Sequence, residues 1–301
     1  MTDLIIIGAG TAGLTAAIYA ARAGLSVKII EKAFYGGQVV TTPLVENYPG
    51  MPGVHGADFA MVIHKQVKDL GVPILYETIQ SAQLGDNIKN IVTSKNTHQA
   101  KTVIIATGAK PRKLGVPGED KWLGHSVVFC ATCDGARYKG KDVAVIGGGN
   151  VAIEDALLLS DLCRIVTVIH RSTNFKAEQK QLEQIKAKDN VKFITDSVVK
   201  ELVGNDFLEK IRIESKTNGQ VTDIAVDGVF VAIGSEPDNS IFANEIHLNE
   251  FGYIIAGEDC LTNLPGVFVA GDTRTKQVRQ LVTAAADGAV AALAAKKHIG
   301  G

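Results

Sequence analysis

The sequence has few cysteines, almost no net charge and no long hydrophobic run. Its 301 residues include four cysteines, too few for the disulfide framework of a small secreted protein. The formal net charge of -1 provides no strongly basic surface for nucleic acid or an anionic membrane. No apolar run reaches the roughly 18–20 residues of a membrane-spanning helix, and no basic segment precedes the first apolar stretch as in a secretory signal. We therefore expect a soluble, cytoplasmic protein that binds neither nucleic acid nor membranes.

A dinucleotide-binding pattern opens the chain. An apolar strand over 4–7 runs into a loop with Gly8, Gly10 and Gly13, followed by an alanine-rich helix and a second strand that ends at Glu31. The glycines permit a tight turn, close approach of a pyrophosphate and close helix packing, and the first amides of the helix favour phosphate. Glu31 stands where a carboxylate holds ribose hydroxyls. A glycine loop alone is weak evidence, but the full strand–loop–helix–strand–acid pattern predicts a nucleotide site.

The same pattern recurs in the middle of the chain at a constant offset. Gly147, Gly149 and Ala152 replace the three glycines of the first loop, and His170 followed by Arg171 stands where the first unit has its acid. A carboxylate there would repel a 2′-phosphate, whereas a cation accepts one. The repeat predicts a second dinucleotide site that favours NADP(H) over NAD(H).

The order of the segments predicts an inserted domain. Gly271 and Asp272 follow a late strand, in a position that suits a hydroxyl or phosphate group of the first nucleotide, so the end of the chain should fold back onto its beginning. We expect an α/β fold with two doubly wound, Rossmann-like domains. The first would cover 1–111 and 245–301, and the second, over 112–244, would be inserted into it. The joints contain proline and glycine and would act as a hinge.

A C-x-x-C pair, Cys130 and Cys133, precedes the second glycine loop. Structural zinc needs further ligands, and Cys163 and Cys260 are solitary. A disulfide around so short a loop adds little stability, because the gain grows with loop length. A redox role is favoured over both, with electrons passing from a nicotinamide through a flavin to the dithiol. Asp134 either exchanges a proton with the leaving thiolate as general acid and base or only forms a turn before the next glycine.

Together these segments resemble the low-molecular-weight thioredoxin reductases of bacteria over essentially the whole chain. The matching segments are GAGTAG, GGQ, ENYPG, ATG, CATCDG, GGGNVAIEDA, AGD and RQLVTAAADG. The resemblance implies an FAD-containing homodimer that uses NADPH to reduce thioredoxin, with domains that rotate to bring nicotinamide and disulfide to the flavin in turn. It also implies that Cys133 faces the flavin, that Cys130 attacks the thioredoxin disulfide and that Asp134 is the acid–base group.

The candidate site residues form one set for each nucleotide. The set that the resemblance implies for FAD is Gly8, Gly10, Gly13, Glu31, Gln38, Asn47, Thr107, Gly108, Asp272, Arg279, Gln280 and Leu281. The set for NAD(P)H is Gly147, Gly149, Asn150, Ala152, His170, Arg171, Lys176, Ile233 and Gly234.

The second nucleotide site departs from the family pattern H-R-R-x-x-x-R. Arg171 is kept, but Ser172 replaces the second arginine and Lys176 the third. Arginine binds phosphate through two parallel hydrogen bonds, whereas lysine acts as a point charge. We expect a weakened preference for NADPH, which leaves NADH or a reduced ferredoxin as alternative donors.

The surroundings of the cysteine pair also depart from the family. His125 stands where the family often has arginine, and Ala136 and Arg137 stand where it often has aromatic residues that dock thioredoxin. The disulfide partner is therefore open. A flavin-dependent oxidase that passes electrons from a small dithiol to oxygen is one alternative, and a flavin-bound redox sensor without catalytic activity is another.

Overall fold

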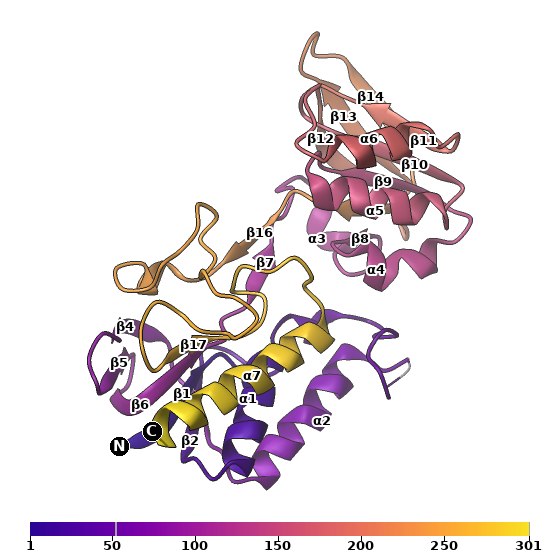
Figure 1. Ribbon diagram of the computed structural model, residues 1–301. Helices are drawn as coiled ribbons and strands as arrows, with labels where there is room; N and C mark the ends of the chain where they lie inside the picture. Colours follow the sequence, from indigo (N-terminus) through magenta and orange to yellow (C-terminus); the bar gives the residue numbers. More distant parts are fainter. Residues whose placement is uncertain (52, 301) are drawn as a thin grey trace. The chain divides into compact units, whose positions relative to one another are not determined.

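The chain folds into two α/β units in a computed structural model that describes residues 1–51 and 53–300 (Figure 1). The first unit contains Met1–Lys110 and the segment from Glu236 onward, and the second contains Pro111–Ser235. Each unit has a largely parallel central sheet with helices packed on one face. The predicted class of two Rossmann-like domains is confirmed.

The central sheet of the first unit is built around one long strand. In the part of the chain that the structure describes, its order is β3-β2-β1-β6-β5-β4, with β17 also paired to β6. The strands are β1 (Thr2–Ile7), β2 (Val27–Glu31), β3 (Ile74–Tyr76), β4 (Ile79–Gln83), β5 (Lys89–Thr93), β6 (Thr97–Ile105) and β17 (Val267–Val269). The beginning of β6 pairs antiparallel with β5, and its end pairs parallel with β17. One strand can thus hold both a hairpin and a segment from the end of the chain.

Close helix packing covers one face of this sheet. The helices of the first unit are α1 (Thr11–Arg22), α2 (Gly56–Asp69) and α7 (Leu281–Gly300), with short 3-10 turns η1 (Gly37–Thr41) and η3 (Ser240–Phe242). Small side chains allow α1 and α7 to approach, because a Cβ added at Gly288 would lie 2.3 Å from the carbonyl oxygen of Ala12. Four alanines of α7 are buried in this core, at Ala284, Ala291, Ala292 and Ala295.

The second unit has a parallel sheet between helices and a smaller antiparallel sheet. Over the described residues, the parallel order is β11-β10-β9-β15-β8 and the antiparallel order is β12-β13-β14. The strands are β8 (Val127–Val128), β9 (Asp142–Ile146), β10 (Ile165–Ile169), β11 (Val191–Ile194), β12 (Ser197–Val203), β13 (Lys210–Ser215), β14 (Val221–Ala225) and β15 (Gly228–Val231). The helical segments are α3 (Glu119–Trp122), α4 (Ala131–Asp134), η2 (Gly135–Tyr138), α5 (Asn150–Ser160) and α6 (Gln179–Lys186).

Two hydrophobic cores hold the second unit together. Ile153 and Leu159 of α5 pack with Val145 of the central sheet in one core. Ile211 and Ile213 of β13 contribute to the other. The antiparallel strands therefore bury the face of the parallel sheet that α5 and α6 leave open.

The second crossing between the units lies earlier than the sequence indicated. The paired strands β7 (Ala109–Pro111) and β16 (Ser235–Pro237) contain the two crossings. The expected insertion was 112–244, but the second unit ends at Ser235. The residues up to 244 belong to the first unit, because Phe242 is buried in its core together with Ile246. No helix in the described part of the chain has the length and apolar character needed to cross a membrane.

Candidate functional site

Predicted nucleotide-binding residues of the first unit gather at one edge of its sheet. Ile7 lies in register with Ile30 of β2 and Ile105 of β6, and Ile105 with Val269 of β17. Because parallel strands end at the same edge, the segments that leave them begin side by side. Those segments contain the predicted residues Gly8, Gly10, Thr107, Gly108 and Asp272, and the predicted Glu31 is the last residue of β2.

The first glycine loop needs its glycines for steric reasons. Gly8 has φ +104°, and a Cβ there would lie 2.4 Å from the carbonyl oxygen of Ala106. A Cβ at Gly13 would lie 1.9 Å from the carbonyl oxygen of Gly8. The Glu31 carboxylate accepts a hydrogen bond of 2.8 Å from the amide of Ala9, within this loop. The predicted acid is thus held beside the glycine loop.

Asp272 is a buried carboxyl with an unused acceptor. Its Oδ1 has no hydrogen-bond partner among the residues described, and burial raises its pKa. The preceding Gly271 has φ +82° and donates its amide to Asp287 at 2.9 Å, which fixes the turn. Arg279 Nε lies 3.5 Å from the Asp272 carbonyl oxygen. A buried polar atom without a partner is rare in native proteins, so Asp272 Oδ1 could accept a hydrogen bond from an external donor such as a hydroxyl.

A network that the sequence did not reveal holds Thr107. Its hydroxyl donates to Asn239 Oδ1 at 3.0 Å and lies 2.8 Å from the hydroxyl of Thr273. Asn239 is 1% exposed and also bonds the backbone of Thr273. It lies in residues 235–239, at the second of the two predicted joints between the domains, where the sequence indicated no binding residue. Asn239 thus connects the loops that follow β6 and β17.

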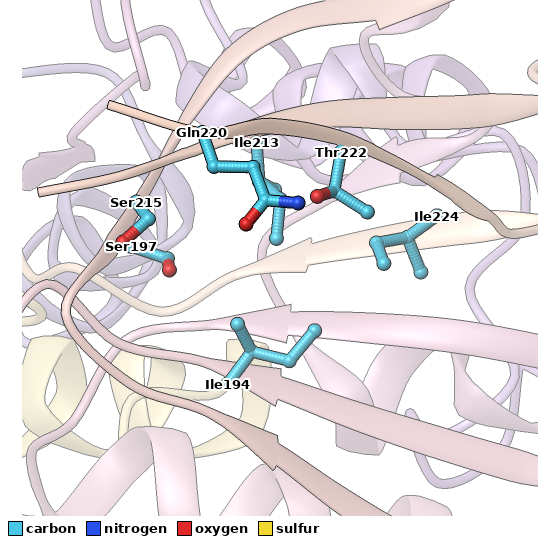
Figure 2. Close-up of a pocket in the computed structure, with 7 residues that line it drawn as sticks. All are labelled: Ile194, Ser197, Ile213, Ser215, Gln220, Thr222 and Ile224. Carbon is cyan, nitrogen blue, oxygen red and sulfur yellow. The ribbon is translucent and has the colours of Figure 1, made fainter. Parts of the chain in front are cut away.

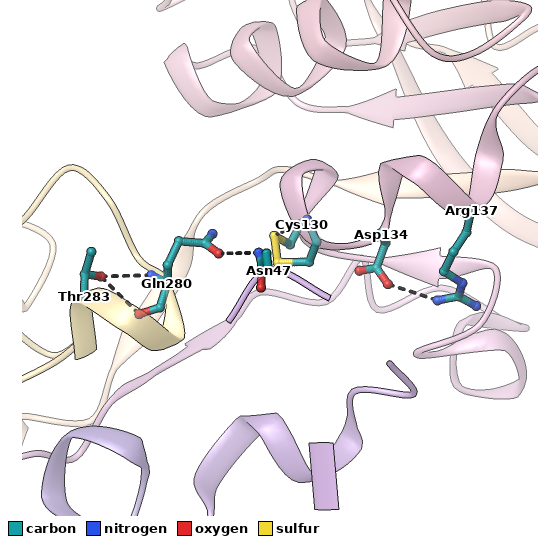
Figure 3. The surroundings of a disulfide bond; sticks show 7 residues. Asn47, Cys130, Asp134, Arg137, Gln280 and Thr283 are labelled. Atoms are coloured by element: carbon teal, nitrogen blue, oxygen red, sulfur yellow. Dashed lines mark hydrogen bonds and ion pairs between the residues drawn. A yellow bond between two sulfur atoms is a disulfide. The ribbon is translucent and has the colours of Figure 1, made fainter. Parts of the chain in front are cut away.

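Two more predicted residues are linked directly at the start of α7. Figure 3 shows Asn47 Nδ2 donating to Gln280 Oε1, at 3.0 Å, and the Gln280 amide donating to Thr283 Oγ1. Gln38 Nε2 donates to the Ala109 carbonyl oxygen. Through these contacts, Gln38 of η1 is attached to the strand that follows β6, and Asn47 is attached to the residue that precedes α7.

The remaining predicted residues of the first set have simple backbone roles. Gly10 is the N-cap of α1, and Gly108 has φ +71°, a conformation that favours glycine. Leu281 begins α7 and packs against a small core that contains Val39 of η1. None of these three residues has a polar side chain, so each could contact a nucleotide only through backbone or apolar atoms.

The second unit repeats the same edge geometry. Ile146 lies in register with both Ile169 and Val231, so Gly147 and His170 leave the sheet together. Gly147 has φ +153°, and a Cβ there would lie 2.3 Å from the carbonyl oxygen of Ala232 and 2.9 Å from the Cβ of Ala152. The predicted Ile233 and Gly234 follow β15, and Gly234 has φ +100°. The second loop is therefore as crowded as the first.

The segment after β10 folds back over the second glycine loop. The His170 ring is 2.4 Å from where a Cβ of Gly148 would lie. The Lys176 amide donates to the Gly148 carbonyl oxygen at 2.7 Å, and the Glu178 amide donates to Asn150 Oδ1 at 2.9 Å. The structure thus brings the predicted His170, Asn150 and Lys176 together around this loop.

Cations gather on the same segment. The side chains of Arg171 and Lys176 are exposed, and Ser172 Oγ accepts a hydrogen bond from the amide of Asn174. Lys216, between β13 and β14, donates to the Arg171 carbonyl oxygen at 3.2 Å. Lys216 was not predicted from the sequence, because it lies far from the motif along the chain.

Cys130 and Cys133 form a disulfide with Cα atoms 5.3 Å apart. The amide of Cys133 donates to Cys130 Sγ at 3.2 Å, so it already points at the sulfur that would carry negative charge after reduction. Over the described ranges, no group of three or more His, Cys, Asp or Glu side chains could hold a metal ion. Cys163 and Cys260 are free, and burial raises their pKa to about 11 and about 12. Such thiols are inert.

Two carboxyls accompany the disulfide. Burial raises the pKa of Asp134, and its ion pair with Arg137, at 3.0 Å, opposes that rise (Figure 3). Burial also raises the pKa of Asp155, to about 7, although its carboxylate accepts a hydrogen bond from the amide of Ala131. Asp155 was missed because it reads as an ordinary residue of α5. The dithiol segment therefore has Asp134 as its predicted proton carrier, and a second, partly buried acid, Asp155, is bonded to the first residue of α4.

A pocket of about 270 Å³ lies elsewhere in the second unit, between the end of β11 and the antiparallel sheet (Figure 2). Its lining residues are Ile194, Ser197, Ile213, Ser215, Gln220, Thr222 and Ile224. None of the predicted site residues lines it. The candidate nucleotide sites are the two sheet edges.

Comparison with known proteins gives one consistent result. Residues 2–288 match the model of a family described as pyridine nucleotide-disulphide oxidoreductase. A "34.2 kDa protein in rubredoxin operon" of Clostridium pasteurianum is 45% identical, covering 99% of this chain and 97% of that protein. Thioredoxin reductase of Listeria monocytogenes is 39% identical, covering 99% and 93%. The crystal structure of thioredoxin reductase from Streptococcus pyogenes superposes with a TM-score of 0.93 at 41% identity, covering 100% and 98%.

Proposed function

Because the chain belongs to the low-molecular-weight thioredoxin reductases of the pyridine nucleotide-disulphide oxidoreductase family, we propose that it uses NADPH and bound FAD to reduce the disulfide of thioredoxin. The observation that carries this proposal is the Cys130–Cys133 disulfide next to a partly buried carboxyl, in the unit that has the second glycine loop. A C-x-x-C disulfide with an adjacent proton carrier is suited to thiol–disulfide exchange.

The sheet edge of the first unit fits FAD. The unpartnered Oδ1 of Asp272 would accept a hydrogen bond from a hydroxyl, and the first amides of α1, which follow the crowded loop at Gly8, would donate to a pyrophosphate. Glu31 would hold ribose hydroxyls. Bound FAD supplies the link between two-electron hydride donation and the dithiol. The residues proposed to bind and orient FAD are the twelve of the FAD set, from Gly8 to Leu281.

The sheet edge of the second unit would hold the nicotinamide cofactor. Gly147, Gly149 and Asn150 would face its pyrophosphate, and the exposed cations Arg171 and Lys176 would meet a 2′-phosphate. We propose NADPH as the preferred donor. Ser172 in place of an arginine removes one bidentate phosphate contact, and this observation favours NADH as a second donor.

Proton transfer at the dithiol would follow from the contacts around it. After reduction, the Cys133 amide stabilises a thiolate at Cys130, which attacks the partner disulfide. Asp134 takes the proton that Cys130 loses and gives it to the sulfur that leaves the partner. Cys133 then attacks Cys130 and re-forms the enzyme disulfide, and its proton passes through Asp134 to the second partner sulfur, which is released as a thiol. Two electrons and two protons pass from the enzyme dithiol to the partner disulfide.

The proposal includes a homodimer in the cytoplasm, as the resemblance implies. Apolar side chains of α7 are open to solvent in the single chain, with Val282 45%, Val290 39% and Leu293 53% exposed. Burial of such side chains against a second copy would be favourable. Sedimentation analysis of the purified protein tests this part of the proposal.

The decisive experiment is an anaerobic titration of the purified flavoprotein with NADPH, with NADH and with a reduced ferredoxin, followed by addition of oxidised thioredoxin. NADPH should bleach the flavin, and thioredoxin should restore its absorbance while gaining two thiols. A Cys130→Ser variant should bleach but fail to transfer electrons. If neither pyridine nucleotide bleaches the flavin, the proposed donor is wrong. Rapid peroxide formation from a small dithiol without thioredoxin turnover would instead identify an oxidase.

A further inference from the structure

Arg137 forms a direct ion pair with the carboxyl next to the dithiol. Its Nη1 lies 3.0 Å from Asp134 Oδ1, and the two side chains are 32% and 14% exposed (Figure 3). The contact spans three residues, from the last residue of α4 to the middle of η2, so it is local and independent of how the units are arranged. At the sequence level Arg137 stands out only as a departure from the aromatic residues often found there in the family.

Few charged groups compete for this carboxyl. Arg137 is the cation that acts on Asp134, and Tyr138, also on η2, is near enough for both charges to influence its hydroxyl. That hydroxyl donates to the backbone oxygen of His125, so it is already engaged. From α5, the other carboxyl close to the dithiol segment is Asp155, which accepts the amide of Ala131. Asp134 is therefore governed mainly by its own burial and by one guanidinium.

These two influences have opposite effects on proton transfer. Burial favours the protonated carboxyl, so it raises the pKa of Asp134 and extends to higher pH the range in which this group can serve as a general acid. An adjacent guanidinium favours the carboxylate and also directs it toward η2. Half-buried pairs of this kind are stronger than pairs on the open surface, because solvent screens them less. The balance between the two decides at which pH the acid is available.

We propose that Arg137 is a positioning residue that sets the pH range in which Asp134 protonates the leaving thiolate. This inference rests on the proposed function. In the step concerned, Cys130 sulfur bonds to one partner sulfur, the partner S–S bond breaks, and the departing sulfur takes the proton of Asp134. The carboxylate so formed is held by Arg137 until it takes the proton of the Cys133 thiol. That sulfur then attacks Cys130 and closes the enzyme disulfide, and Asp134 passes the proton to the second departing partner sulfur.

The test is the pH dependence of kcat/KM for thioredoxin at saturating NADPH. A general acid loses activity as pH rises through its pKa. Without the guanidinium, burial alone acts on Asp134, so Arg137→Gln should move the alkaline limb to higher pH by about one unit. Arg137→Lys keeps the charge and should restore most of the wild-type profile. The matched control is Arg164→Gln, which breaks an exposed bidentate pair with Asp142 in the same unit and should leave the limb in place.

A second measurement separates this inference from the proposed function. Infrared difference spectra of the purified protein, with Asp134→Asn as reference, follow the protonated carboxyl of Asp134 directly and need no substrate. In Arg137→Gln this band should persist to higher pH than in the wild type. If the band shifts but the wild type does not reduce thioredoxin, the proposed function fails and the positioning role stands. If the wild type turns over but neither band nor alkaline limb moves in Arg137→Gln, the positioning role is refuted.

Discussion

Arg274 provides a direct test of how the turn after β17 is held. Its side chain is 1% exposed and donates two hydrogen bonds to Asp287, each of 2.9 Å. The same carboxylate accepts the Gly271 amide and Lys276 Nζ, again at 2.9 Å. Asp287 therefore ties α7 to the turn that carries Asp272. Removing Arg274 should affect both the stability of the first unit and the retention of the flavin.

We predict that Arg274→Ala lowers the free energy of unfolding by about 3–5 kcal/mol, because the buried Asp287 carboxylate loses two charge-assisted hydrogen bonds and one of its two cations. Burial disfavours ionised Asp287, but hydrogen bonds from Arg274 and Lys276 outweigh burial and lower its pKa. The carboxylate therefore stabilises the fold above its ordinary pKa of 3.8, and this stability is lost as pH falls through the lower folded value. In the variant that loss should begin at a higher pH.

The assay is urea unfolding of the flavoprotein, followed by far-UV circular dichroism and by the fluorescence of released flavin. The matched control is Arg164→Ala in the second unit, where an arginine whose side chain is 68% exposed pairs with Asp142 at 2.8 Å. Its unfolding midpoint should stay at the wild-type value, because solvent screens the pair. A loss below about 1 kcal/mol in Arg274→Ala, typical of surface pairs, would refute the argument that this cluster anchors the turn.

Three further substitutions test separate parts of the site. Cys133→Ser should abolish thioredoxin turnover while NADPH still bleaches the flavin in stopped-flow absorbance, and residual turnover would show that one thiol suffices. Gly13→Ala places a Cβ 1.9 Å from the Gly8 carbonyl oxygen, so the purified protein should lack flavin absorbance, and a full flavin content would contradict the steric argument. Ser172→Arg adds a charged phosphate contact and should raise the NADPH-to-NADH ratio of kcat/KM by roughly tenfold or more. An unchanged ratio would place the 2′-phosphate elsewhere.

The sequence predicted those features that depend on local geometry. The spacing around Gly8 and Gly147 requires a tight turn after a strand, and the structure has that turn in both units, with the carbonyl oxygens of Ala106 and Ala232 closing it. The Cys130 disulfide follows from residue spacing in the same way. Strand, turn and helix patterns within about thirty residues leave few alternatives, so two Rossmann-like domains could be inferred.

Features that depend on contacts between distant segments were not predictable. Asn239 became a partner of Thr107 only through folding. Asp155 has no distinguishing feature in the sequence, and its contact with the dithiol segment arises because α5 packs against that segment. The boundary near residue 244 was placed too far along the chain relative to the compact unit, because nothing local shows that Phe242 is buried in the first unit. Periodicity alone does not say which core a short apolar segment joins.

The two ends of the second unit are held to each other. The amide of Arg112 donates to the carbonyl oxygen of Gly234 at 3.0 Å, so the chain enters and leaves this unit at one place. A domain whose ends lie this close together can be inserted or removed without interrupting the central sheet of the first unit. For protein engineering, the same bond marks where a single short peptide could replace the whole of Pro111–Ser235 and leave a one-nucleotide flavin domain.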